Sequence, residues 1–326
     1  MELFFHALKM VLLLGIPLLG FEIVGVGGFE YKSPSTKEFT PISTLIQEAQ
    51  LDDVNSVSLW ITREWSENWY PASEVNQHIV EKGYTPIFIV YWFADDISVD
   101  YIQKHDKEYY GYLKRLRRYL DEIKGKKIIV LNPEYNQFGV EGWSGFNQLL
   151  LNSKKILDHG DILIGPCVGD FGNYDLVFDP LNWKNFDTSI KNSIQSFDFI
   201  AFQEMRSLTK DTPEQIRKLP PRIESFSAYL HATYEKPVLL AYLALSSWGA
   251  EGETLQKDVF ERLAKRQNIL MQSGMIGMNL FHLVDVSSHV GYFGLGEKHF
   301  GIYRSDLTVK SSVYYFKQIQ SQKKIK

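Results

Sequence analysis

Residues 126–136 read KKIIVLNPEYN, a run of aliphatic residues that ends abruptly in polar side chains. An unbroken run of Val, Ile and Leu is typical of a strand that is buried on both faces of a parallel sheet. Stretches with 3.6-residue periodicity flank this run, at about Val99–Lys124 before it and Trp143–Asp158 after it. The order of helix, buried strand and helix indicates a repeating βα unit.

The same alternation extends over most of the chain. The predicted strands are Glu22–Phe29, Ser56–Glu64, Thr85–Phe93, Lys127–Glu134, Asp161–Val168, Phe197–Gln203, Pro237–Leu245 and Ile276–Val284. The remaining predicted helices are Ile42–Gln50, Pro71–Lys82, Asp179–Gln195, Pro213–Tyr234, Glu253–Ser273 and Val309–Gln320. Eight such units in 326 residues predict an α/β fold, a (β/α)8 TIM barrel that forms a single domain over residues 21–322.

A doubly wound sheet is the alternative fold. It normally has fewer strands, and in its dinucleotide-binding form a G-x-G-x-x-G turn follows the first strand. The first predicted strand is followed instead by GVGGFE at 25–30, which lacks that spacing. The sequence therefore favours the barrel and gives no sign of a dinucleotide cofactor.

Composition excludes several classes of protein. The chain is 44% hydrophobic, which rules out a disordered chain, and its net charge of −4 does not suggest a nucleic-acid partner. The single cysteine, Cys167, excludes an internal disulfide and a Cys-x-x-Cys zinc site. The eight histidines form neither His-x-His nor His-Glu-x-x-His, so we expect no metal and no cofactor.

The N-terminal residues 1–20 contain an apolar segment, Val11–Leu19, that is too short to cross a bilayer as a helix. It fits the apolar region of a signal peptide, and the alternative is an N-terminal extension that packs against the barrel. We therefore expect an exported protein, periplasmic or extracellular, with no membrane span in the mature chain. A cytoplasmic location is the alternative. Residues 323–326 are expected to form a basic tail.

The predicted strands end in carboxylates, amides and aromatic rings, and these ends form the functional face of such a barrel. Hydrolysis of a glycosidic bond needs this set, because one carboxylic acid protonates the leaving oxygen and a second carboxylate attacks the sugar or activates water. Aromatic rings, here seven Trp, 18 Tyr and 21 Phe, can stack on sugar rings. A strand-end acid such as Asp95, Asp96 or Asp170 can equally be a helix N-cap or a surface charge.

Glu134 is the strongest catalytic candidate. It closes an otherwise apolar strand, so its carboxyl should be partly desolvated, and desolvation raises a carboxyl pKa toward the range of a general acid. Asn132 has the same parity in the strand, so both side chains are expected to face the barrel mouth. The alternative is a glutamate that accepts hydrogen bonds from amides of a neighbouring loop.

The second carboxylate is expected to be Glu204, with Glu64 as the competitor. Glu204 follows Gln203 at the end of the sixth strand, and alternation allows only one of the two to face inward unless the strand has ended. The other candidate substrate-binding residues at the strand ends are Arg63, Tyr91, Trp92, Asn132, Asn136, Asp170, Gln203, Tyr242, Trp248, His282 and Asp285.

In these features the chain resembles the (β/α)8-barrel glycoside hydrolase superfamily, especially the clan with an Asn-Glu pair at the end of strand 4. Asn132 and Glu134 are similar to that clan's hydroxyl-binding Asn and its acid/base Glu, although Pro133 stands between them. The resemblance implies a glycoside hydrolase whose partner is an oligo- or polysaccharide. The clan's nucleophilic Glu at the end of strand 7 is missing, because Tyr242 stands at about its place. The alternative is therefore a barrel that binds carbohydrate without catalysis.

Overall fold

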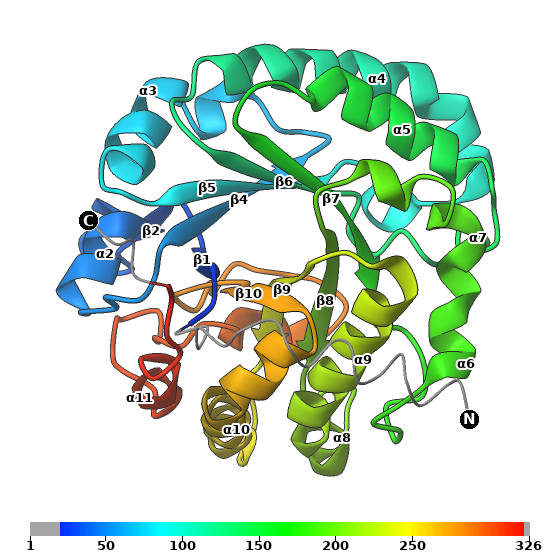
Figure 1. Cartoon of the computed structure of the whole chain (residues 1–326). Helices are drawn as coiled ribbons and strands as arrows, with labels where there is room; N and C mark the ends of the chain where they lie inside the picture. The colour runs from blue at the N-terminus through cyan, green and yellow to red at the C-terminus, as the bar shows by residue number, and fades with distance from the viewer. Residues whose placement is uncertain (1–19, 323–326) are drawn as a thin grey trace.

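The computed structural model describes residues 20–322. It shows a closed barrel of parallel strands with helices around it, as the sequence predicts (Figure 1). The barrel strands are β1 (Ile23–Gly27), β4 (Ser56–Thr62), β5 (Thr85–Tyr91), β6 (Lys127–Leu131), β7 (Ile162–Gly169), β8 (Ile200–Arg206), β9 (Val238–Leu245) and β10 (Met275–Leu280). The predictions for residues 1–19 and for the tail at 323–326 lie outside the described residues.

Hydrogen bonds join the strands in chain order, and β1 pairs with both β4 and β10 to close the barrel. All of these pairings are parallel, so every strand delivers its carboxyl end to the same mouth. A short antiparallel hairpin, β2 (Glu30–Lys32) with β3 (Phe39–Pro41), is inserted after β1, and the sequence pattern does not predict it.

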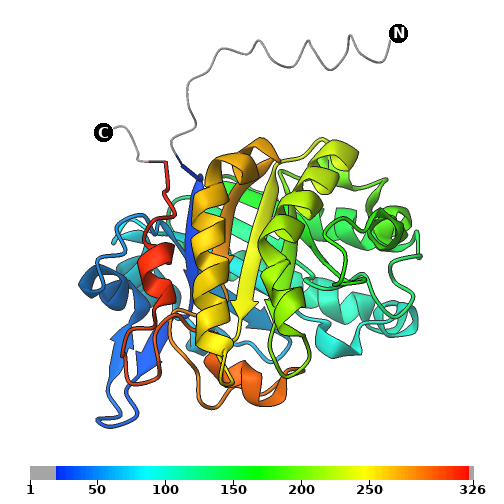
Figure 2. The same cartoon turned by 90° about the horizontal axis from the view of Figure 1, so that it is seen from below.

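The longer helices match the predicted ranges. They are α2 (Ile42–Glu48), α4 (Val99–Asp121), α5 (Phe146–Leu157), α9 (Leu219–Tyr234) and α10 (Gly252–Gln272), and α9 and α10 lie side by side in Figure 2. Other predicted helices are broken into short pieces. The prediction Pro213–Tyr234 divides into α8 (Pro213–Arg217) and α9, because Pro220 and Pro221 have no N–H to donate to the preceding turn.

The remaining pieces are short. They are η1 (Glu67–Trp69), α3 (Ala72–Val75), η2 (Asn76–Val80), η3 (Ala94–Asp96), α6 (Pro180–Trp183), η4 (Lys184–Phe186), α7 (Asp187–Ile190), η5 (Ile194–Ser196), η6 (Gly294–His299) and α11 (Ser312–Phe316).

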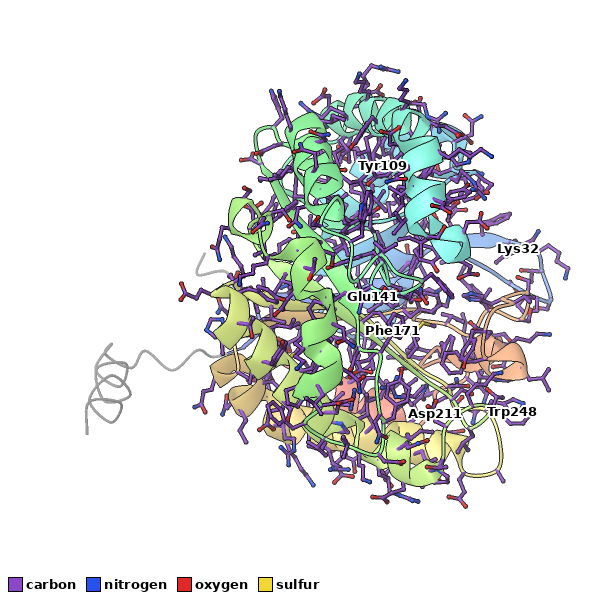
Figure 3. All side chains as sticks on the ribbon, turned by 90° about the vertical axis from the view of Figure 1, so that its right-hand side faces the viewer. Lys32, Tyr109, Glu141, Phe171, Asp211 and Trp248 are labelled. Carbon is purple, nitrogen blue, oxygen red and sulfur yellow. The ribbon has the colours of Figure 1, made fainter. Side chains whose placement is uncertain are left out.

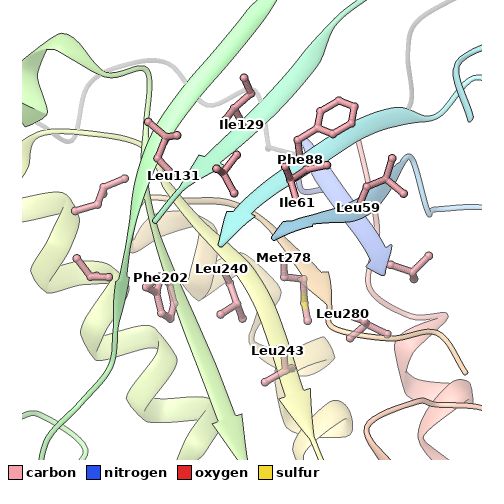
Figure 4. Packing of buried hydrophobic residues seen from close by; sticks show 14 of the residues in the cluster. Leu59, Ile61, Phe88, Ile129, Leu131, Phe202, Leu240, Leu243, Met278 and Leu280 are labelled. Atoms are coloured by element: carbon pink, nitrogen blue, oxygen red, sulfur yellow. The ribbon is translucent and has the colours of Figure 1, made fainter. Parts of the chain in front are cut away.

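Strand alternation separates two apolar cores. On β5, Ile87 and Ile89 point into the barrel, whereas Phe88 and Val90 point outward to the helices. Figure 4 shows this outer core between the strands and the helices, with Phe88, Phe202 and Met278 among its labelled members. Because both faces of each strand are covered, the strands read as continuous apolar runs in the sequence.

The barrel interior also holds one buried polar bridge. The Nδ2 amide of Asn279 on β10 donates to Ser58 Oγ on β4 at 2.9 Å and to the carbonyl of Ala241 on β9 at 3.0 Å. Its side chain crosses directly over Gly25 of β1, where a Cβ atom would overlap the amide. A glycine is therefore required at this position for reasons of space.

We predict that Gly25→Ala destabilises the fold by about 1–3 kcal/mol, because the added methyl must displace the Asn279 amide from a packed interior. Gly111→Ala is the matched control. Gly111 lies within α4, and the space that an alanine Cβ would take there has no other atom within 4 Å, so this variant should be more stable by about 0.5–1 kcal/mol. Urea unfolding of both variants measures the difference, and equal midpoints would contradict the prediction.

Candidate active site

Glu134 lies at the barrel mouth, three residues past the end of β6. Asn132 and Glu134 both adopt left-handed backbone conformations, with φ of 48° and 62°. Residues other than glycine rarely adopt this region, and such residues cluster at functional sites. The turn aims the two side chains in different directions, because strand alternation no longer applies to them.

The Glu134 carboxyl is half-buried, and the hydroxyl of Tyr242 donates a hydrogen bond to its Oε1 at 2.7 Å. Burial raises the pKa of Glu134 to about 7, the hydrogen bond from Tyr242 opposes this rise, and the negative charges of Asp95 and Glu297 add to it. A carboxyl with this pKa is partly protonated at neutral pH. It can therefore donate a proton to a leaving group.

An aromatic cluster packs around Tyr242, the hydrogen-bond donor of Glu134. The ring of Trp60 lies 5.6 Å from that of Tyr91, 5.1 Å from that of Tyr242 and 5.1 Å from that of Phe281, all in edge-to-face contact. Tyr242 is fully buried, whereas Trp60 and Tyr91 are half-buried. Through Tyr242, which donates to Glu134, this aromatic cluster adjoins the carboxyl whose burial raises its pKa.

Two other carboxylates act on Glu134 through their charge. Asp95, on the loop after β5, is exposed and accepts a hydrogen bond from the Tyr91 hydroxyl at 3.1 Å. Glu297, on η6, is buried and accepts a hydrogen bond from the Phe293 N–H at 2.9 Å. Sequence reasoning misses Glu297, because it lies far beyond the end of β10, in a loop whose path the pattern does not predict.

The structure corrects the expectation for Glu204. Strand β8 continues to Arg206, so alternation still applies, and Glu204 shares the outward face with Phe202 of the outer core. Its carboxyl is fully buried and lies 2.8 Å from Arg206 Nη2. Burial raises the pKa of Glu204 well above its usual range, the positive charge of Arg206 opposes this rise, and the negative charge of Asp170 adds to it. Glu204 therefore belongs to a charge cluster behind the barrel wall.

Asp170 anchors the same cluster. It accepts hydrogen bonds from Arg222 Nη2 of α9 at 2.6 Å and from Trp183 Nε1 at 2.7 Å. Although burial disfavours its charge, the hydrogen bonds from Arg222 hold the pKa of Asp170 below its usual value. These contacts tie β7 and β8 to α9, and they make Asp170 a structural residue rather than part of the mouth.

Three predicted residues near β4 and β5 also lie away from Glu134. The Glu64 side chain is 66% exposed beside Arg63, whose guanidinium pairs with Asp96 at 3.1 Å. Trp92 is buried in the outer core against Tyr109 of α4.

The same Tyr109, labelled beside α4 in Figure 3, donates a hydrogen bond to Asn132 Oδ1 at 3.0 Å. The expectation that Asn132 faces the mouth is therefore corrected as well.

The remaining predicted residues divide into four groups. Asn136 exchanges hydrogen bonds with the backbone of Gly169, at 2.6 Å and 2.9 Å, and so fastens the Glu134 loop to β7. Gln203, on the interior face of β8, has a buried Oε1 without a partner among residues 20–322. His282 is buried against Phe281, and burial followed by the charge of His289 lowers its pKa to about 3.

Trp248 and Asp285 form the fourth group, since both line a separate cavity at the same end of the barrel. Among residues 20–322, no group of three or more His, Cys, Asp or Glu side chains is arranged to hold a metal ion. Within the same range, no helix has the length and apolarity needed to cross a membrane.

Comparisons with known proteins support the fold. No family model and no curated protein matches the sequence. Among solved structures, a β-glucuronidase from an uncultured Clostridium species is similar with a TM-score of 0.62 and 14% identity, over 92% of this chain and 50% of that one. A fungal β-1,4-galactanase gives a TM-score of 0.62 and 13% identity, over 92% of this chain and 100% of the galactanase. The GH5_18 protein of Bifidobacterium longum gives a TM-score of 0.60 and 13% identity, over 92% of this chain and 81% of that protein.

The chain thus spans half the length of the glucuronidase and all of the galactanase. At these identities the likeness shows the fold, which is the (β/α)8 barrel found in those glycoside hydrolases.

We predict that Tyr242→Phe raises the pKa of Glu134 above about 7, because the phenol stabilises the charged carboxylate. A carbon-13 NMR titration of the glutamate carboxyls measures it, with Glu134→Gln to assign the signal. Tyr314→Phe is the control, because that ring is 66% exposed on α11. A lower pKa in Tyr242→Phe would contradict the hydrogen-bond direction.

Glu134→Gln should also change how stability depends on pH. The pKa of Glu134 is about 7 in the fold and near 4.5 in the unfolded chain, so the folded protein binds more protons between these values. The contribution of Glu134 to the stability of the wild type is therefore fully present below pH about 4.5, and it is lost as pH rises through about 7. Relative to wild type, the variant should gain up to roughly 3 kcal/mol between pH 4.5 and 8. Parallel pH dependences of the two proteins would contradict this.

Proposed function

We propose that the protein is a glycoside hydrolase in which Glu134 is the general acid. The single observation that carries this proposal is a protonatable carboxyl, with a pKa of about 7, held half-buried among aromatic rings at the mouth of a barrel. A general acid works best when its pKa lies near the operating pH. The substrate class is an oligo- or polysaccharide, which the similar fold of glycan-cleaving barrels supports.

We assign Asp95 as the second carboxylate, the nucleophile or the base that activates water. Asp95 is exposed at the mouth, its charge acts on Glu134, and the hydroxyl of Tyr91 orients it. Glu297 also acts on Glu134 but is buried, so a substrate cannot reach it in this arrangement. Glu204 and Glu64, the candidates taken from the sequence, lie behind the barrel wall and on its exposed rim.

A carbohydrate-binding barrel without catalysis is the second candidate. The observation that favours it is Tyr242, which is fully buried and stands where the resemblance places a nucleophilic carboxylate. A phenol without solvent access cannot attack a sugar. The two candidate functions therefore differ in whether Asp95 acts as the nucleophile or base that Tyr242 cannot be. We also propose an exported location, which the apolar segment Val11–Leu19 supports.

The test compares wild type with Glu134→Gln, Asp95→Asn and Glu64→Gln on a panel of aryl glycosides and polysaccharides. Loss of the general acid should lower kcat by about 10²- to 10⁴-fold. Glu64→Gln, a rim carboxylate of the same type, is the matched control and should leave kcat unchanged. In wild type, kcat/KM should fall as pH rises through about 7, because Glu134 then loses its proton.

Three results would count against the proposal. A wild type that binds glycans but hydrolyses none supports the binding barrel, and a wild type that does neither removes both candidates. A hydrolase that loses activity in Glu64→Gln, but not in Asp95→Asn, contradicts the assignment of the second carboxylate.

A further inference from the structure

A second hollow opens at the same end of the barrel as Glu134. It is a cavity of about 370 Å³ beside the loop that follows β9, and its walls include Ser247, Trp248, Lys298, Arg304 and Lys310. Trp248, labelled at the edge of the molecule in Figure 3, presents a half-buried indole to this cavity. The volume lies within the range of small-molecule sites in proteins.

The short helix η6 separates this cavity from the mouth. It is fixed to the end of β9, because Ser246 Oγ donates to the Gly296 carbonyl at 2.8 Å and the Ser247 N–H donates to the His299 carbonyl at 3.0 Å. Figure 2 shows this orange segment next to the arrowhead of β9. Within η6, Glu297 acts on Glu134 through its charge, while the next two residues, Lys298 and His299, line the cavity.

The charges of the cavity are unequal. Both of its carboxylates are already paired: Glu253 with Arg304 at 2.5 Å, and Asp285 with Lys310 at 2.7 Å. Lys310 is only 1% exposed, and its Nζ also donates to Ser247 Oγ at 2.7 Å and to the Gly301 carbonyl at 2.8 Å, so its donors are used.

Arg304 and Lys310 are thus paired, and Lys298 is the third cationic side chain of the cavity wall. Within residues 20–322 it forms no ion pair, and it lies on the wall of the cavity. His299 stands next to it, and its Nδ1 lies 3.6 Å from Asp285, the carboxylate that already pairs with Lys310. The lining therefore carries an uncompensated positive charge beside the hydroxyls of Ser247, Ser287 and Ser305.

We propose that this cavity binds a sugar unit that bears a negative charge, a carboxylate or a sulfate, with its ring against Trp248 and its anion on Lys298. An ammonium that has no other partner makes charge-assisted hydrogen bonds to such groups. The inference rests on the proposed glycoside hydrolase function for the ligand being a sugar, and it makes the substrate an acidic glycan that reaches from the mouth across η6.

The experiment follows the indole N–H signal of Trp248 by nitrogen-15 NMR in wild type, with Trp248→Phe to assign it. The probes are sodium D-glucuronate, D-glucose 6-sulfate and D-glucose, with sodium acetate and sodium sulfate as simple anions. At least one charged sugar should bind about tenfold more tightly than glucose, the gain of about one charge-assisted hydrogen bond. Glucuronate and the sulfate ester distinguish the two sources of charge.

Lys298→Gln should abolish the tenfold preference, while Lys114→Gln, at an exposed lysine on α4, should keep it. The inference is overturned if glucose binds as well as the charged sugars, if no probe moves the signal, if the simple anions bind as well as the sugars, or if both variants behave alike. Binding of monosaccharides needs no hydrolysis. The test of the cavity can therefore fail while the test of Glu134 as general acid succeeds. The opposite result is equally distinguishable.

Discussion

The mouth of the barrel depends on one constraint, a carboxyl group placed against aromatic rings with a single phenol as its hydrogen-bond donor. Burial of Glu134 disfavours its charged form. The hydrogen bond from the Tyr242 hydroxyl stabilises the carboxylate, but by less than the lost water would. Asp95 and Glu297 add negative charge nearby. A cation in their place would have given an ordinary ionised glutamate, so the absence of a basic partner for Glu134 within residues 20–322 is what gives this site an acid.

Strand alternation divides the buried charges of the protein between two compartments. The outward face of β8 places Glu204 and Arg206 in a buried cluster with Asp170 and Arg222, in which Arg206 contacts Glu204 and Arg222 pairs with Asp170. The inward face of the barrel holds polar amides, such as Asn279, while Glu134 lies beyond the strands, in the loop that follows β6. These contacts thus link the strands to the helices behind the barrel wall, whereas Glu134 at the mouth has no cation as its partner within residues 20–322.

Much of the fold can be predicted because its signal is local. The eight predicted strands lie within a few residues of the observed ones, since a strand covered on both faces must be a short apolar run. Glu134 can be found for the same reason, as a charge that interrupts such a run. Breaks inside helices, such as the one between α8 and α9, are harder to predict, because they depend on packing as well as on sequence.

The partners of Glu134 cannot be predicted in the same way, because they depend on geometry beyond the strands. The prediction for Glu204 is wrong because the expected strand end falls three residues too early, which reverses the face to which its side chain belongs. The prediction for Asn132 is wrong because a left-handed residue breaks the alternation that the parity argument assumes. Glu297 reaches the mouth only through the path of a long loop.

The link between Asn136 and the backbone of Gly169 divides the loop after β6 into two parts. The part before it, with Glu134, is fastened to the next strand, whereas the part after it carries Phe138, which is 66% exposed. Evolution can therefore lengthen or rewrite the outer part without moving the acid. In a lineage of such proteins, the position of Glu134 would be kept while the surface around it diverged.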